Sequence, residues 1–145
     1  MPPQHPPIPE ISAEQLRRLS PAAFAYIGDA LYELHCRQIY LYPPLRQETY
    51  HRRVVERVKG TAQAALLDRL SPHLLPEEQA IVNWGRNGCG KAPRHLSAQV
   101  YRHASGLETL LGYLHLTDPE RLHCLLNLCD QLVLENSDSI PSDPA

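Results

Sequence analysis

Two acidic residues inside apolar helical segments are the positions in this chain best suited to chemistry. Asp29 directly follows Gly28, and Glu108 lies four residues before Gly112. Glycine in a helix interior costs roughly 1 kcal/mol relative to alanine. A carboxylate that faces a core is unfavourable unless it is paired or bound to a cation. Two helices, each with one inward carboxylate and one small residue for close approach, predict a shared cation site.

A hard divalent cation such as Mg2+ suits two carboxylates, because it takes oxygen ligands, keeps several waters and bridges to phosphate. Basic residues near the acids would then hold the phosphates of a substrate. These are the components of metal-assisted phosphodiester hydrolysis. A structural role is an equal alternative, in which such an acid caps a neighbouring helix or pairs with an arginine such as Arg102.

The charge distribution is compatible with binding to a polyanion. The formal net charge is −2, yet the stretch from Arg37 to Arg102 holds eleven lysines and arginines against five acidic residues. Six acids and one arginine follow between Thr117 and the end. A basic middle with acidic ends fits a polyanion-binding face, and a solvated surface of mixed charge is the alternative.

The elements that must position these residues are all expected to be helices. Ser12 with Gln15 forms a capping-box pattern, and Ser20-Pro21 opens a longer helix that Pro43-Pro44 ends. The apolar residues of this helix have the spacing of a core stripe, although the same residues could form the seam of a dimer. They are Phe24, Ile27, Leu31 and Leu34.

The rest of the chain continues in helices around one loop. Residues 46–70 are expected to be helical with a bend near Gly60, and Pro76 opens a helix through Trp84. Residues 85–95 hold three glycines and a proline, which predicts a loop. Ser97 caps the helix that carries Glu108, and a last helix runs from Asp118-Pro119 to about Glu135. No pattern indicates a strand, so the predicted fold class is all-α.

We expect one domain at residues 12–135, between an unstructured Pro-rich tail at 1–11 and an acidic tail at 136–145. No secretory leader is expected, because the first residues lack an apolar segment. No apolar run approaches the roughly 18 residues of a membrane span. The four cysteines have neither metal-site nor disulfide-framework spacing. These features predict a cytoplasmic protein without a membrane partner.

Four short segments resemble motifs of ribonuclease III domains. Residues 25–30, Ala-Tyr-Ile-Gly-Asp-Ala, are similar to that family's signature helix, and residues 107–114 resemble its second acidic helix. Gly85-Arg86-Asn87 and Tyr101-Arg102 match the short branch called Mini-III ribonuclease, which has a catalytic domain and no double-stranded-RNA-binding domain after it. The resemblance covers residues 13–135.

The resemblance implies a helical bundle that forms a homodimer and acts as a Mg2+-dependent endoribonuclease on double-stranded RNA, leaving 5′-phosphate ends. Asp29 and Glu108 would be the catalytic metal ligands. The implied substrate is the 23S ribosomal RNA precursor, trimmed at both ends with a large-subunit ribosomal protein as a partner. Eight basic residues are candidates for RNA contact: Arg52, Arg53, Arg57, Lys59, Arg86, Lys91, Arg94 and Arg102.

The carboxylate set is smaller than the family's usual pattern. Ala25 stands where the family has a glutamate before the signature aspartate, and Ser105 stands where it has an aspartate before the second-helix glutamate. Ser97 stands where the short branch has another acid. Glu33, one turn after Asp29, is a supplementary ligand or a surface charge. We hypothesise that one metal per site binds firmly and a second binds only with substrate.

Two functions of other classes remain open. One is a catalytically silent ribonuclease III-like domain that serves as an RNA-binding or ribosome-assembly module; such a protein would tend to lose Asp29 or Glu108, and both are present. The other is an all-α interaction protein whose acids pair with arginines.

Overall fold

The computed structural model describes residues 10–138, with side chains to Asn136, and between these limits it contains helices and no strand. The all-α prediction is therefore confirmed. The predicted tails at 1–11 and 136–145 lie largely outside the described residues. The helices are α1 (Ala13–Arg17), α2 (Pro21–Ile39), α3 (Gln47–Val58), α4 (Gly60–Leu70), the short 3-10 helix η1 (Ser71–His73), α5 (Pro76–Gly88), α6 (Ala98–Thr117) and α7 (Pro119–Asp138).

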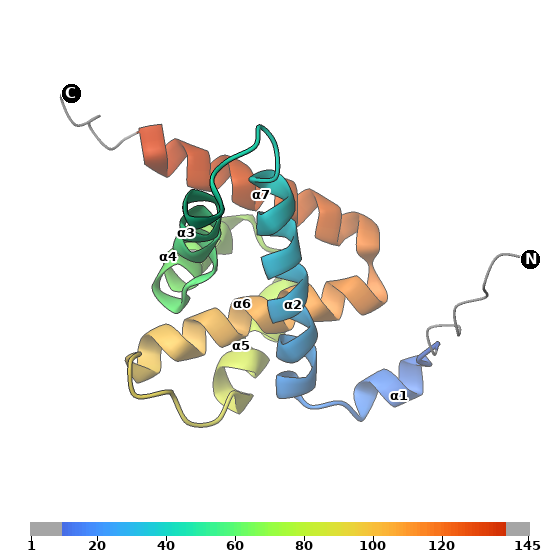
Figure 1. The fold of residues 1–145 in the computed structure, drawn as a ribbon. Helices are drawn as coiled ribbons and strands as arrows, with labels where there is room; N and C mark the ends of the chain where they lie inside the picture. The colour runs from blue at the N-terminus through green and yellow to red at the C-terminus, as the bar shows by residue number, and fades with distance from the viewer. Residues whose placement is uncertain (1–9, 139–145) are drawn as a thin grey trace, which may run out of the picture.

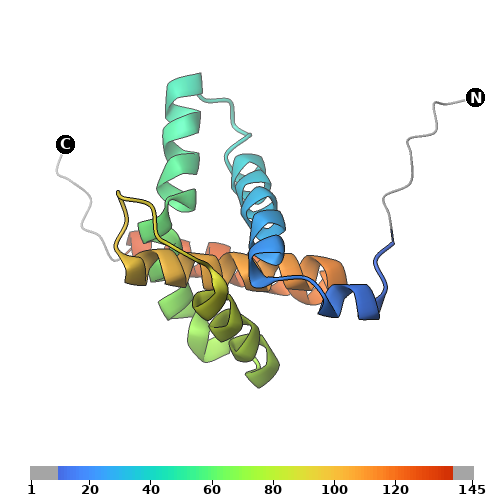
Figure 2. The same ribbon diagram turned by 90° about the horizontal axis from the view of Figure 1, so that it is seen from below.

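Helix α6 is the centre of the fold, and α2, α4, α5 and α7 all pack against it. In Figure 1, α2 crosses over α6, and Figure 2 shows α2 and α3 on one side of α6 with α5 on the other. The core beneath these helices is built mostly from leucines, including Leu107, Leu110 and Leu111 of α6 and Leu125 of α7. Helix α6 therefore positions four of the other helices.

The helix starts follow the predicted caps. The Ser20 hydroxyl accepts a hydrogen bond from the Ala23 N–H at 3.3 Å, and the Ser97 hydroxyl accepts one from the Val100 N–H at 3.1 Å. These oxygens satisfy backbone donors that have no partner within their own helix. The beginnings of α2 and α6, the two helices that carry the acids, are thus fixed by local sequence.

Two glycines allow α2 and α6 to cross almost in backbone contact. A Cβ atom at Gly28 would overlap the backbone carbonyl oxygen of Glu108, and one at Gly112 would overlap the carbonyl oxygen of Phe24. The contact is reciprocal, because each glycine admits the backbone of the other helix. The predicted role of these small residues in close approach is confirmed.

The buried face of α2 differs from the predicted core stripe. Phe24 is buried, but Ile27 and Leu34 are 40% and 57% exposed. The buried residues of α2 are instead spaced by four, and they face α6 because the two helices cross at Gly28. They are Phe24, Gly28, Tyr32 and Cys36. The apolar residues of the predicted stripe that face outward therefore remain available for another contact.

The predicted boundaries shift in two places. Helix α5 continues to Gly88, so residues 85–88, predicted as loop, are helical. Gly85 is buried against the side chain of Thr109 on α6, and this packing compensates for glycine's low helix propensity. Helix α7 also extends to Asp138, beyond the predicted end near Glu135. The predicted bend near Gly60 is confirmed as a break at Lys59, whose backbone is extended.

Candidate active site

The helix crossing brings Asp29 and Glu108 to a common cleft of about 190 Å3. Asp29 comes from α2 and Glu108 from α6, and each lies beside the close contact made by Gly28. Asp29 is exposed and Glu108 is partly buried, so the acids border an open cleft. The expectation that both carboxylates face the core is therefore wrong. The cleft is also lined by Pro21, Ala22, Ala25, Tyr26, Gly85, Cys89, Tyr101, Ser105 and Thr109.

The two carboxyl groups are electrostatically coupled. Burial, followed by repulsion from Asp29, raises the pKa of Glu108 to about 7, against an opposing hydrogen-bonding contribution from Gln63. Burial, followed by repulsion from Glu33, also raises the pKa of Asp29. The pKa values of both acids are raised by burial and by a neighbouring carboxylate, and no basic group lowers them. The negative charge of the cleft is therefore not neutralised by a basic side chain. Perturbed carboxyls of this kind gather at functional sites.

Among the described residues that line the cleft, the carboxylates are Asp29 and Glu108. Glu33 pairs with Arg37 on the same helix at 2.8 Å, which places its charge in a surface ion pair. No cluster of three or more His, Cys, Asp or Glu side chains suited to a metal occurs among the described residues. Ala25 and Ser105 both line the cleft, and Ser97 is occupied in capping α6. Two of the positions where the usual family pattern has an acid, Ala25 and Ser105, therefore lie in the wall of the cleft without a carboxylate.

The loop between α5 and α6 is attached to the first turns of α6. The Tyr101 hydroxyl donates to the Cys89 carbonyl at 3.1 Å. Arg102 donates through Nε to the Arg86 carbonyl at 3.1 Å and through Nη2 to the Asn87 side-chain oxygen at 3.2 Å. The Tyr-Arg and Gly-Arg-Asn motifs are therefore two halves of one contact. It fixes the end of α5 at the rim of the cleft.

The predicted RNA-binding residues separate into surface and interior groups. Arg52, Arg53 and Lys59 of the α3–α4 region and Lys91 and Arg94 of the loop are exposed. Arg86 is partly buried, and Arg102 is exposed while its donors hold the end of α5.

Arg57 is a correction to the sequence prediction. Arg57 is only 7% exposed. Its guanidinium donates to the Asp130 carboxylate at 2.9 Å and to the Tyr32 hydroxyl at 3.2 Å. Helical periodicity turns this position inward, toward α2 and α7. Arg57 is therefore an internal ion-pair partner and is not available for phosphate binding.

Comparison with known proteins identifies the family. The ribonuclease III domain model matches residues 22–119. A Mini-ribonuclease 3 of Synechococcus sp. is 49% identical over 80% of this chain and 84% of its own length. The chain belongs to the Mini-ribonuclease 3 family of ribonuclease III-type endoribonucleases. A Mini-ribonuclease 3 of Gloeobacter violaceus is 45% identical over 90% of this chain and 97% of its own.

The fold of this Mini-ribonuclease 3 family member also occurs in a solved structure. A crystal structure of a Fusobacterium nucleatum protein matches it with a TM-score of 0.72 and 25% identity, over 80% of this chain and 95% of that one. The matched domain includes both Asp29 and Glu108. None of the described helices is long and apolar enough to cross a lipid bilayer.

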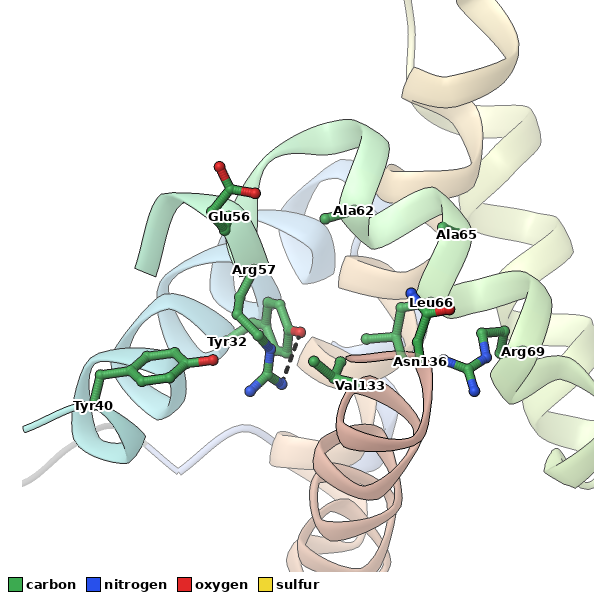
Figure 3. Close-up of a pocket in the computed structure, with 10 residues that line it drawn as sticks. All are labelled: Tyr32, Tyr40, Glu56, Arg57, Ala62, Ala65, Leu66, Arg69, Val133 and Asn136. Atoms are coloured by element: carbon green, nitrogen blue, oxygen red, sulfur yellow. Dashed lines mark hydrogen bonds between the residues drawn. The ribbon is translucent and has the colours of Figure 1, made fainter. Parts of the chain in front are cut away.

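A second pocket, of about 290 Å3, lies away from the acids of this Mini-ribonuclease 3 family member. It contains the Arg57 guanidinium, which reaches the Tyr32 hydroxyl (Figure 3). Its basic groups already have partners: Arg57 pairs with Asp130, and Arg69 lies 3.7 Å from Glu135 and donates to the Leu132 carbonyl. The pocket therefore lacks uncompensated charge, in contrast to the cleft at Asp29 and Glu108.

Two cleft-associated residues of this Mini-ribonuclease 3 family member are not among the sequence-predicted site residues. Cys89 lines the cleft from the loop. Gln63 of α4 is 2% exposed, and hydrogen bonding from its side chain lowers the pKa of Glu108 against the effect of burial. The only sequence signal for Gln63 is one amide within the otherwise apolar run Ala62–Leu67, and its proximity to Glu108 depends on tertiary packing.

Proposed function

We propose that this protein is a Mg2+-dependent endoribonuclease that cuts double-stranded RNA as a homodimer, with Asp29 and Glu108 holding the ion. The observation that carries this proposal is the glycine crossing of α2 and α6, which brings the two acids to one cleft. A protein that only needed two packed helices would have no reason to keep two unpaired carboxyls beside their contact.

The donor set of the cleft fits Mg2+. This ion commonly binds through one or two carboxylates, keeps waters, and completes its coordination with substrate phosphate. Asp29 and Glu108 provide two carboxylates, and their raised pKa values show that they lack a compensating positive charge. When bound, the ion would activate water and stabilise the leaving oxygen of a phosphodiester. The open cleft leaves room for the RNA backbone beside the acids.

The exposed basic residues would bind the phosphates of the duplex. A-form RNA is recognised largely by shape, phosphates and 2′-hydroxyls across its wide minor groove. Lys91 and Arg94 extend from the loop that lines the cleft, and Arg52, Arg53 and Lys59 lie on the exposed surface around the α3–α4 break. The contact between Arg102 and the end of α5 holds this loop next to the acids. We assign Arg102 a positioning role together with any phosphate contact.

An exposed apolar strip on α2 supports the proposed dimer. Tyr26, Ile27 and Leu34 are 82%, 40% and 57% exposed, and Leu41 and Tyr42, which follow the helix in sequence, are exposed as well. A second copy would cover this strip, and two-fold symmetry is the usual arrangement of soluble homodimers. Tyr26 also lines the cleft, so a partner on this face would border the acids. Two sites would then act on the two strands of one duplex.

The substrate that we propose is the 23S ribosomal RNA precursor, whose 5′ and 3′ ends the enzyme would mature. Cleavage would leave 5′-phosphates, and a large-subunit ribosomal protein would present the RNA. This part of the proposal is supported by the family motifs at residues 25–30, 85–87 and 101–102. Dependence on a ribosomal protein would compensate for the modest number of exposed basic groups.

The direct test is cleavage of labelled duplex RNA with Mg2+ and with EDTA, using wild-type protein and the Asp29→Asn and Glu108→Gln variants. Glu77→Gln is the matched control, because Glu77 is an exposed acid at the start of α5. We expect Mg2+-dependent cutting that both site variants lose and the control retains. RNA binding without cutting by the wild type would instead support a silent RNA-binding module. An active Asp29→Asn variant would reject the proposed site.

A further inference from the structure

Helix α4 places a buried amide against the acid pair. Gln63 is almost fully enclosed, at 2% exposure, and α4 packs directly on α6. Hydrogen bonding from the Gln63 side chain lowers the pKa of the Glu108 carboxyl, against the larger effect of burial. Gln63 is thus a buried polar residue whose side chain acts on one of the two acids.

The Gln63 amide is also fixed at the break between α3 and α4. Its Nε2 atom donates to the backbone carbonyl of Val58 at 2.8 Å, and its own N–H donates to the Lys59 carbonyl at 3.1 Å. Both acceptors lie where α3 ends and the backbone of Lys59 becomes extended. The side chain therefore connects a rigid backbone position to Glu108. Its orientation is set by the break and not by the carboxyl.

The oxygen of the same amide has no hydrogen-bond partner. Gln63 Oε1 is one of the few buried side-chain atoms without one among the described residues. A buried polar atom without a partner is destabilising, and it calls for an explanation beyond stability. An apolar side chain of similar shape would fill the position without leaving this oxygen unpaired. The amide is thus poorly explained by packing alone.

We propose that Gln63 is a positioning residue for the metal ligand Glu108, which it orients toward Asp29 from the α3–α4 break. This inference rests on the proposed function, because it takes Asp29 and Glu108 as the metal ligands. Hydrogen bonds to a ligating carboxylate fix its orientation, and loss of such a partner typically lowers metal affinity by about 10–100-fold. The amide thus serves metal binding at the expense of an unpaired oxygen.

The test measures Mn2+ binding to the metal-free protein by electron paramagnetic resonance, with thermal unfolding in parallel. Mn2+ is the probe because it shares the preference of Mg2+ for oxygen ligands. Gln63→Met removes the amide and keeps the shape, and Gln63→Asn keeps an amide too short to reach both partners. We expect both variants to bind Mn2+ about tenfold more weakly or worse, with melting temperatures close to the wild type. Cleavage by both should recover at high Mg2+.

Leu66→Ala is the control for general damage, since Leu66 is buried on the same helix. It should lower the melting temperature and leave Mn2+ affinity unchanged. Wild-type affinity in folded Gln63→Met and Gln63→Asn would overturn the inference, as would failure of both variants to fold, which would show a structural role. The Asp29→Asn variant separates the two proposals. If it binds Mn2+ as well as the wild type does, the proposed function fails; if only the Gln63 variants are unaffected, this inference alone fails.

Discussion

Gly28 of α2 lies against the backbone carbonyl of Glu108 on α6, with no room for a side chain between them. The residue that permits the helix contact is adjacent in sequence to Asp29, and the carbonyl that it meets belongs to the other acid. Helix packing and the geometry of the acid pair are therefore the same structural feature. A change in one must displace the other.

Gly28→Ala should destabilise the protein and impair the cleft together. Alanine would favour the helix by roughly 1 kcal/mol, but its Cβ would overlap a backbone oxygen that cannot rotate away. Overpacking of this kind costs about 1–3 kcal/mol. Urea unfolding measures the loss. Gly60→Ala is the control, because a Cβ there meets only the flexible side chain of Leu96; an equal loss in both variants would contradict the argument.

The metal-free protein should lose stability as the pH rises through 7. The pKa of Glu108 is raised to about 7 in the folded state, so the folded state holds the proton more tightly than the unfolded state does. This contribution is fully present below the unfolded pKa of about 4.3 and is lost as pH rises through the folded pKa. Asp29 acts in the same direction.

Urea unfolding with EDTA at pH 5.5 and pH 8 tests this dependence. We expect a decrease on the order of 2 kcal/mol toward pH 8, from a shift of this size at a partly buried group. Glu108→Gln should remove most of the difference because it cannot titrate. A wild-type protein that is more stable at pH 8 would contradict the assignment.

Arg57→Met should destabilise the protein by about 1–3 kcal/mol, because Asp130 loses its buried partner and keeps only His35. Although burial acts against it, hydrogen bonds from His35 and Arg57 hold the pKa of Asp130 below its usual value. Arg53→Met is the matched control on the exposed face of α3, and its stability should stay within about 0.5 kcal/mol. RNA affinity should follow the opposite order and fall for Arg53→Met. A surface role for Arg57 would reverse both results.

Arg102→Met should release the loop from α6. The variant loses the donors to the Arg86 carbonyl and the Asn87 side chain, so amide hydrogen exchange at residues 86–92 should become faster. Cleavage should fall mainly through a higher KM if the loop holds RNA. Arg94 makes no such contacts with α5. Arg94→Met should therefore weaken RNA binding without changing the amide hydrogen exchange of residues 86–92. Unchanged exchange in Arg102→Met would show that the loop is held by other means.

The sequence predicts the parts of this fold that depend on neighbouring residues. The caps at Ser20 and Ser97 form as expected, because each serine bonds an N–H only three positions away. The close approach at Gly28 and Gly112 is also predictable, since glycine in an apolar helix signals backbone contact. The proximity of the two acids follows from it, although the exposure of Asp29 at the cleft rim does not.

The parts that depend on tertiary packing are not predictable from local sequence. Helix propensity ends α5 near Trp84, whereas burial of Gly85 against Thr109 carries it to Gly88. Burial of the charged Arg57 side chain requires a partner, and that partner, Asp130, lies on α7. Gln63 reaches Glu108 only because α4 packs on α6. Each error has the same cause: a partner distant in sequence that outweighs local preference.

The most direct test of the central claim is anomalous diffraction from crystals soaked in Mn2+. We predict one peak per protomer between the carboxylates of Asp29 and Glu108 in the RNA-free protein, and no peak in the Asp29→Asn variant. One firm site agrees with the two-carboxylate set, and a second ion is expected only with RNA bound. Two strong peaks in the free protein would contradict the single-metal hypothesis. A peak at another position, with none at these two acids, would contradict the assigned site itself.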